Sequence, residues 1–260
     1  MDINSVLGDV VGLVRTVGDR ILRISRRRKY ITYKGAIDLV TQFDRQSQTR
    51  IVNALCRKFP GFGILSEENY QREASSTAKW IIDPLDGTTN FAHNLPLWSI
   101  SVALEIDSAI VLGVVYDPSR REMFTAVKGR GAFLNRQRIR VSRIKKIEQS
   151  LLVTGFPYDI RRSRRNNINY FRAFSLTAQA VRRLGSAALD LCYTACGRFD
   201  GYWELKLAPW DQAAGSLIVR EAGGRITDFR GRDFNVYGDE VVATNGFIHR
   251  PMMKILAMKK

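Results

Sequence analysis

The sequence has few of the side chains that most often hold transition metals, since its 260 residues include two His and three Cys. The cysteines are odd in number, and their spacing to His93 or His249 is not that of a zinc site. We therefore expect neither a disulfide framework nor a zinc centre. Cys192 and Cys196 lie in an apolar helical segment, which predicts buried free thiols.

Long apolar runs are also missing. No segment approaches the roughly 20 apolar residues that a membrane-spanning helix needs, and the first residues lack the basic and apolar regions of a secretory signal. We therefore expect a cytoplasmic protein with no membrane association. Hydrophobic residues still make up 45% of the chain, which is enough for a large buried core.

Acidic residues are scarce relative to basic ones. The 25 Asp and Glu residues face 41 Lys and Arg residues, which gives a formal net charge of +16. The excess is concentrated in Arg26–Lys29, Arg136–Lys146 and Arg161–Arg165. Such runs predict attraction to polyanions. The alternative is a solvated basic surface, because no aromatic residues interleave the runs as they would on a base-stacking surface.

Hydrophobic periodicity predicts the elements of the first half. Apolar residues recur every three or four positions from Val6 to Ile24 and from Asp44 to Phe59, which indicates two amphipathic helices. Short alternating segments then predict an antiparallel meander with strands at 98–104, 110–116 and 122–126. The polar segment Asn69–Lys79 is expected to be mobile and to act as a lid.

After about residue 145, strands alternate with helices. We expect a strand at 151–154 and helices near 166–177, 186–196 and 210–222. The sequence therefore predicts an α+β protein with two sheets and layered helices. It would form a single domain over 1–260, with lobes at about 1–145 and 146–260.

The octet Asp83–Asn90, DPLDGTTN, is the most informative motif. The apolar run Trp80–Ile82 precedes it, so a strand would deliver Asp83 to its C-terminal end, and Gly87 would let main-chain N–H groups approach a ligand. Oxygen atoms of Asp83, Leu85 and Asp86 suit a hard cation such as Mg²⁺. The alternative, for such a motif alone, is an Asp-rich turn that satisfies its own backbone.

Two further acidic motifs accompany the octet. Glu67 and Glu68 end a predicted strand that begins at Gly63, and Asp211 lies at the start of a predicted helix, in PWDQAAG. Taken singly, a Glu pair is usually a solvated edge and such an Asp is usually a helix cap. Together with the octet they form a specific set.

As a set, these motifs resemble the inositol monophosphatase family, the Mg²⁺-dependent, lithium-sensitive phosphatases related to fructose-1,6-bisphosphatase. The resemblance covers nearly the full chain and extends to Gly185–Ala188 and Gly201–Glu204. It implies an α/β/α/β/α sandwich with two mixed or antiparallel sheets. It also implies a homodimer, formed through the segment around residues 160–183. The bacterial branch looks most similar, because Ala208 stands where some animal enzymes are expected to carry a substrate-pocket His.

The resemblance further implies a site for two to three Mg²⁺ ions, for which Mn²⁺ can substitute. Glu67, Asp83 and the Leu85 carbonyl would hold the first ion, and a third, weaker ion would rely on Glu67 and water. The second ion would bind Asp83, which bridges, together with Asp86 and Asp211. Such ions activate water and offset the charge of a phosphate ester.

Catalytic and binding roles follow from the same resemblance. Glu67 and Thr88 would orient and deprotonate the attacking water, with Asp83 bridging the metals, and no phosphoenzyme would form. N–H groups of Gly87 and Thr88 would bind phosphate. The other substrate contacts would be Asp86, Gly185, Ser186, Ala187, Glu204 and Asp211. Asp38, Asp44 and Glu68 would be supporting residues that orient ligands and waters, and Lys34 would neutralise this acidic cluster.

Several alternatives stay open. Glu204 could be a plain strand-end carboxylate, Gly185–Ser186 could be a helix cap, and Asp190 and Asp200 are expected to be structural. The favoured substrate is a small phosphorylated polyol, myo-inositol monophosphate. Fructose-1,6-bisphosphate, 3′-phosphoadenosine 5′-phosphate and histidinol phosphate are alternatives, because the metal motifs are shared across these activities. A role of a different class is binding to RNA or the transcription machinery, which is reported for some bacterial relatives.

Overall fold

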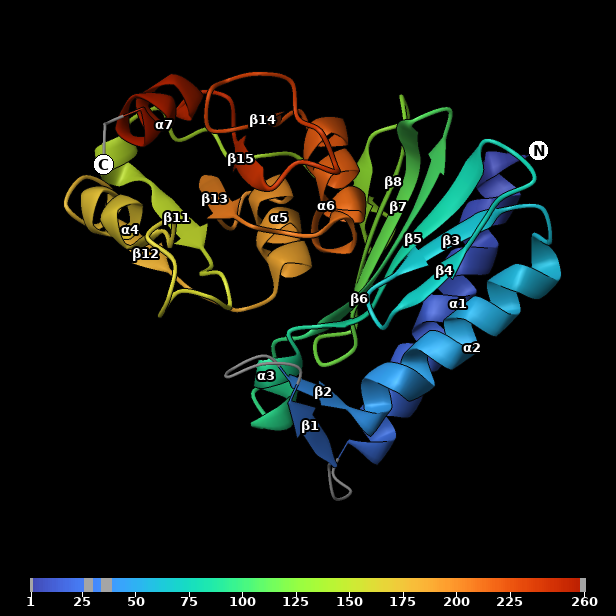
Figure 1. The fold of residues 1–260 in the computed structure, drawn as a ribbon. Coiled ribbons are helices and arrows are strands. Elements are labelled where there is room, and N and C mark those ends of the chain that lie inside the picture. The colour runs from blue at the N-terminus through green and yellow to red at the C-terminus, as the bar shows by residue number, and fades with distance from the viewer. Residues whose placement is uncertain (1, 26–29, 34–38, 258–260) are drawn as a thin grey trace.

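The computed structural model describes residues 2–25, 30–33 and 39–257. Helices and two large sheets alternate in five layers (Figure 1). The basic run Arg26–Lys29 and the predicted supporting residues Lys34 and Asp38 lie outside the described residues. In the part of the chain that is described, no helix is long and apolar enough to cross a membrane.

The larger sheet is mostly antiparallel. Its eight strands are, in spatial order, β10 (Gln137–Arg138), β9 (Ala132–Leu134), β8 (Glu122–Val127), β7 (Ala109–Asp117), β6 (Ser99–Ile106), β5 (Ala78–Asp86), β3 (Gly63–Ser66) and β4 (Tyr70–Arg72). Only β3 and β5 pair in parallel. The predicted meander is confirmed as β6, β7 and β8.

The smaller sheet is mixed. Its five strands are, in spatial order, β12 (Ala180–Arg182), β11 (Leu151–Thr154), β13 (Gly201–Leu205), β15 (Glu240–Thr244) and β14 (Arg225–Thr227). The first three run parallel, and β15 is antiparallel to both of its neighbours. A hairpin of β1 (Ile31–Tyr33) and β2 (Leu39–Thr41), which the sequence did not predict, stands apart from both sheets.

Three pairs of helices complete the layers. On the outer face of the larger sheet lie α1 (Ile3–Ile24) and α2 (Gln42–Lys58), and between the sheets lie α5 (Ala187–Ala195) and α6 (Pro209–Glu221). On the outer face of the smaller sheet lie α4 (Ile168–Ser175) and α7 (His249–Leu256). The short helix α3 (Thr88–Ala92) follows β5, and a 3₁₀ turn, η1 (Ile147–Gln149), precedes β11. The predicted α/β/α/β/α sandwich is confirmed.

The layers are joined by three apolar clusters. Trp80 belongs to the cluster beneath α1 and α2, whereas its neighbour Ile81 belongs to the cluster between the sheets. Successive residues of a strand point to opposite faces, so β5 is buried on both sides. This explains the continuous apolar run that ends at Asp83.

Two predictions need adjustment. Asn69–Lys79 is not irregular throughout, because β4 lies inside it and pairs with β3, from Tyr70 opposite Ser66 to Arg72 opposite Ile64. The residues between β4 and β5 lie at the start of β5, at the other end of this strand from Asp83, so they are not placed to act as a lid near the predicted metal site. Cys192 is buried as predicted and Cys196 is half-buried, and both are free thiols.

Candidate active site

The parallel pairing of β3 and β5 brings the first carboxylates together at the carboxyl-terminal ends of these two strands of the larger sheet. β5 carries Asp83 and Asp86, and Glu67 directly follows β3, where its N–H donates to the carbonyl of Ile82 at 3.3 Å. The pairing of β5 with β6 is irregular between Asp83 and Asp86. Oδ1 of Asp83 accepts a hydrogen bond from the Leu85 N–H at 2.9 Å, which stabilises this turn.

Asp211 comes to the same place from the first turn of α6. Its Oδ2 accepts a hydrogen bond from the Ala208 N–H at 2.7 Å. Burial, followed by the charges of Glu67, Asp86 and Asp211, raises the pKa of Asp83 well above its usual value. Burial and the charges of Asp86 and Glu67 do the same to the pKa of Asp211. The four carboxylates are therefore close enough to repel one another.

This donor set fits a hard cation, because it contains only oxygen atoms and because a positive charge would relieve the repulsion. Within the described residues, however, no group of three or more His, Cys, Asp or Glu side chains is already arranged to hold a metal ion. Asp83 and Asp211 instead accept hydrogen bonds from the backbone. A carboxylate that accepts one hydrogen bond keeps lone pairs for a cation, and the predicted ligand set stays a prediction.

Asp44 and Thr88 form a buried pair beside this cluster. Oδ2 of Asp44 accepts hydrogen bonds from the N–H of Thr41, at 2.8 Å, and from the Thr41 hydroxyl. Oγ1 of Thr88 lies 2.9 Å from Asp44 Oδ1 and 3.0 Å from the Leu85 carbonyl oxygen. Burial raises the pKa of Asp44 to about 6, and the nearby charge of Glu68 contributes. Asp44 thus contacts Thr88 and lies near Glu68, and the supporting roles of Asp44 and Glu68 stay predictions.

Asp86 links the larger sheet to the start of α5. Its Oδ2 accepts hydrogen bonds from the Ser186 hydroxyl, from the Ala188 N–H at 2.9 Å and from the Ser99 hydroxyl at 3.4 Å. Burial raises its pKa to about 6, although these donors oppose the rise. The side chain of Ser186 also caps α5 by accepting from the Leu189 N–H. Ser186 therefore caps α5, which was the alternative interpretation, and also contacts Asp86 at the candidate site.

Gly87 brings the start of α3 against the turn before α5. Its φ is +89°, and a Cβ there would lie 2.9 Å from the Leu97 carbonyl oxygen and 3.3 Å from that of Gly185. Asn90 joins the same segments, because its Nδ2 donates to the carbonyls of Leu97, at 2.8 Å, and Leu184, at 2.7 Å. Close backbone packing therefore requires glycine at position 87.

A cavity of about 100 Å³ opens beside these residues. The predicted residues that line it are Asp86, Gly87, Gly185, Ser186, Ala187, Glu204 and Asp211. Glu204 is buried and accepts a hydrogen bond from the Tyr202 hydroxyl at 2.7 Å. Burial raises the pKa of Glu204 to about 7, opposed by Tyr202 and by the charge of Arg183. Sequence reasoning missed Arg183 and Gly155, which also line the cavity.

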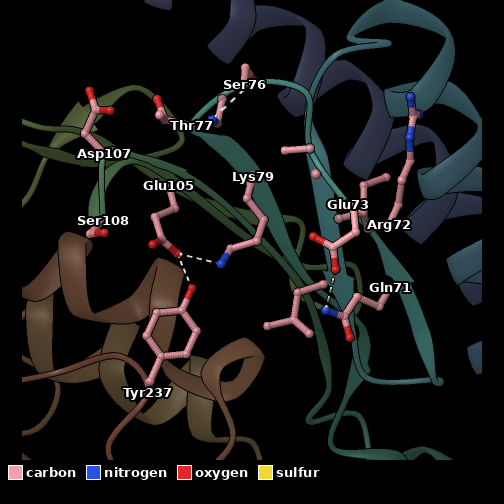
Figure 2. Close-up of a pocket in the computed structure, with 15 residues that line it drawn as sticks. Gln71, Arg72, Glu73, Ser76, Thr77, Lys79, Glu105, Asp107, Ser108 and Tyr237 are labelled. Atoms are coloured by element: carbon pink, nitrogen blue, oxygen red, sulfur yellow. Dashed lines mark hydrogen bonds and ion pairs between the residues drawn. The ribbon is translucent and has the colours of Figure 1, made fainter.

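A larger groove, of about 760 Å³, lies at the opposite end of β5 (Figure 2). Lys79 Nζ lies 3.6 Å from Glu105 Oε2, which also accepts a hydrogen bond from the Tyr237 hydroxyl. Lys79 precedes Asp83 by four residues, or about 13 Å of extended strand. Of the predicted site residues that the structure describes, none lines this groove. The smaller cavity is therefore the candidate active site.

Asp190 and Asp200 differ in their surroundings. Asp200 accepts hydrogen bonds from the Ser142 hydroxyl and from the Leu151 N–H, so its predicted structural role is supported. Asp190 is buried, and among the described residues neither of its carboxylate oxygens has a hydrogen-bond partner. Burial and the charges of Glu204 and Asp86 raise its pKa well above the usual value.

Known proteins resemble this chain over nearly its whole length. The model of the inositol monophosphatase family matches residues 2–258. An inositol-1-monophosphatase of Synechocystis sp. is 43% identical, over 98% of this chain and 90% of that protein. A Nus factor SuhB of Haemophilus influenzae is 42% identical, over 97% of this chain and 96% of that protein.

Solved structures agree with these relatives. The extragenic suppressor protein suhB of Bartonella henselae superposes with a TM-score of 0.92 at 36% identity, over 98% of this chain and 100% of the other. Inositol monophosphatase of Anabaena (Nostoc) superposes with a TM-score of 0.91 at 36% identity, over 100% and 98% of the two chains. The chain therefore belongs to the inositol monophosphatase family, a family of metal-dependent phosphatases.

Proposed function

We propose that this protein hydrolyses the phosphate monoester of a small polyol, with myo-inositol monophosphate as the preferred substrate. The observation that carries the proposal is the convergence of four carboxylates from β5, the end of β3 and the start of α6, next to a cavity lined by Glu204. A site of this kind uses its acidic residues to hold cations and its cavity to hold the alcohol.

The cations would be two to three Mg²⁺ ions, or Mn²⁺ ions in their place. When bound, they would lower the pKa of water and offset the charge of the phosphate. Glu67, Asp83, the Leu85 carbonyl, Asp86 and Asp211 would hold them. The mutual repulsion of these carboxylates supports this role, because each gains more from a cation than an isolated carboxylate would.

The chain's own groups would prepare the attacking water. The Thr88 hydroxyl has one proton and two acceptors within reach, Asp44 and the Leu85 carbonyl. A hydroxyl that donates to Asp44 keeps a lone pair for a water molecule and so orients it. Glu67 would then accept the proton of the water, whose oxygen attacks the phosphorus directly. As this P–O bond forms, the bond to the ester oxygen breaks, and the alkoxide leaves and takes a proton from solvent.

The remaining residues would bind the substrate. The N–H groups of Gly87 and Thr88 would face the phosphate, and Glu204, with the Gly185–Ala187 turn, would face the ring hydroxyls. A buried carboxylate that has already accepted one hydrogen bond from Tyr202 can accept others from an alcohol. This arrangement favours a polyol over a featureless ester.

A screen of phosphate release over sugar, inositol and nucleotide phosphates tests the proposal. We expect the highest kcat/KM on inositol monophosphate, with activity in Mg²⁺ or Mn²⁺ and none in excess EDTA. A higher value on fructose-1,6-bisphosphate, 3′-phosphoadenosine 5′-phosphate or histidinol phosphate would reassign the substrate. Activity that survives EDTA would refute the metal-dependent mechanism.

We also propose a homodimer, formed through the segment around residues 160–183. Two large apolar side chains of this segment, Ile168 and Leu176, are 50% and 78% exposed. Large apolar side chains that are exposed to water favour burial in an interface. Sedimentation analysis should give twice the mass of one chain, whereas a single-chain mass that is unchanged by concentration would contradict the dimer.

A second candidate function is binding to RNA or to the transcription machinery, since several relatives carry the name Nus factor SuhB. The side chains of Arg140, Arg143 and Lys145 are exposed. The fold also places an aromatic ring beside them, because Lys145 Nζ lies 5.7 Å from the ring centre of Phe247, which is 51% exposed. RNA retention that falls steeply with salt, and that weakens in Lys145→Ser and Phe247→Ala, would support this role. Retention that these changes leave intact would exclude this surface.

A further inference from the structure

Gly155 lies directly against the carboxylate of Glu204. A Cβ at position 155 would lie 2.1 Å from Glu204 Oε1 and 2.3 Å from its Cδ, far inside van der Waals contact. The backbone of Gly155 is not in the left-handed region. Glycine is therefore needed here for space and not for its backbone freedom. The main chain of this residue forms one wall of the space that holds the Glu204 carboxylate.

Asn167 fixes the strands from which these two residues emerge. Its Nδ2 donates to Thr154 Oγ1 at 2.8 Å and to the Gly155 carbonyl at 2.5 Å, and its Oδ1 accepts from Trp203 Nε1 at 2.7 Å. The Thr154 hydroxyl in turn donates to the Trp203 carbonyl at 2.5 Å. Asn167 is 2% exposed, so water does not compete for these bonds.

The network acts at the ends of β11 and β13. Thr154 and Trp203 are opposite one another in this parallel pair. Gly155 follows Thr154, and Glu204 follows Trp203. The hydrogen bonds that hold Thr154 and Trp203 in place therefore also set the distance between Gly155 and Glu204. Asn167 does not itself line the cavity. It can influence a substrate only through the position of Gly155 and Glu204.

We propose that Gly155 and Asn167 are positioning residues that aim Glu204 at the alcohol part of the substrate, and thereby set specificity for polyol phosphates. This inference rests on the proposed function. The Gly155 main chain on one side and the hydrogen bond from the Tyr202 hydroxyl to Oε2 together restrict the orientation of the carboxylate. A methyl group at position 155 would push it toward the cavity of about 100 Å³, where the polyol has to fit.

The test compares Gly155→Ala with the wild type on inositol monophosphate and on an aryl phosphate without ring hydroxyls. We expect KM for inositol monophosphate to rise about tenfold or more, as for the loss of a charged hydrogen bond. KM for the aryl phosphate should rise by a clearly smaller factor, because this substrate has no ring hydroxyls for Glu204 to bind. Gly12→Ala is the matched control, because a Cβ at Gly12 meets no atom within 4 Å. Equal losses on both substrates, or no loss, would overturn the inference.

A double-mutant cycle separates positioning from general damage. If Gly155 acts through Glu204, adding Gly155→Ala to Glu204→Gln should cost little further on inositol monophosphate, whereas additive losses would contradict this coupling. Asn167→Asp keeps the acceptor for Trp203 but removes both donated bonds, and should show the same split between substrates with a smaller KM effect. An equal loss of activity on both substrates in Asn167→Asp would contradict the positioning role of Asn167. A wild type inactive on every phosphate monoester would refute the proposed function itself, and the positioning role with it.

Discussion

Asp44→Asn should stabilise the metal-free protein at neutral pH while it impairs catalysis. Asp44 is fully buried and its pKa is raised from 3.8 to about 6, chiefly by burial. Its ionised form is thus disfavoured in the folded state. The asparagine can keep the contacts, because its Oδ1 can accept from Thr41 and because the Thr88 hydroxyl has the Leu85 carbonyl as a second acceptor at 3.0 Å.

The magnitude follows from the pKa. A folded-state pKa above the unfolded value means that the folded protein binds the proton more tightly, so its contribution to stability is complete below about pH 3.8 and is lost as the pH rises through about 6. A rise from 3.8 to about 6 corresponds to about 3 kcal/mol of unfolding free energy. Asparagine cannot ionise and does not incur this loss.

The assay is urea unfolding in EDTA at several pH values between 4 and 8, for the wild type and Asp44→Asn. The unfolding free energy of the variant minus that of the wild type should increase by about 2.5 kcal/mol across this range, because a small part of the effect already falls below pH 4. Any difference in unfolding free energy that is already present at pH 4 does not affect the test, because only the change of this difference with pH reports the charge of Asp44. A difference that is constant with pH, or that falls, would refute the reasoning about this buried carboxylate.

Three further predictions concern substrate, cation and surface. Glu204→Gln should raise KM for inositol monophosphate by the equivalent of about 1 to 3 kcal/mol and should affect an aryl phosphate less; equal effects in kinetic assays would return Glu204 to a structural role. Millimolar lithium should inhibit turnover uncompetitively or noncompetitively and should do so less in Asp211→Asn, and unchanged turnover in wild-type assays would put the second cation in doubt. Replacing the exposed Arg161, Arg162 and Arg164 with Ser should lower RNA retention at low salt without changing kcat. Arg165 is kept because it pairs with Asp239 at 2.6 Å. Unchanged RNA retention would mean that this run is solvated surface.

The elements that sequence reasoning found are those with their own periodic signal. The stripe of α1 places Val10, Val14 and Ile21 in the core, and the run before Asp83 is apolar because β5 is covered on both faces. The site residues were found because Glu67, the octet and Asp211 each lie at the end or start of such an element. Their convergence depends on the parallel pairing of β3 and β5, which the sequence alone does not show.

The missed features depend on partners that are distant in sequence. Strands such as β12 and β14 have three residues each and gain their structure from neighbouring strands. Asn167 looks like an ordinary polar residue, yet its partners are 12, 13 and 36 residues away. Likewise Arg165, in a run that suggested free charge, is paired with Asp239 and Glu240 more than 70 residues later in the chain.

The most direct test of the central claim is a magnesium titration of phosphate release from inositol monophosphate, with the wild type and Asp83→Asn side by side. Asp83 accepts one backbone hydrogen bond and is repelled by three neighbouring carboxylates, so asparagine preserves the fold and removes the charge that would bridge two cations. We predict saturable Mg²⁺-dependent release by the wild type and none by a folded Asp83→Asn. Full activity of Asp83→Asn, or of the wild type in excess EDTA, would contradict the claim.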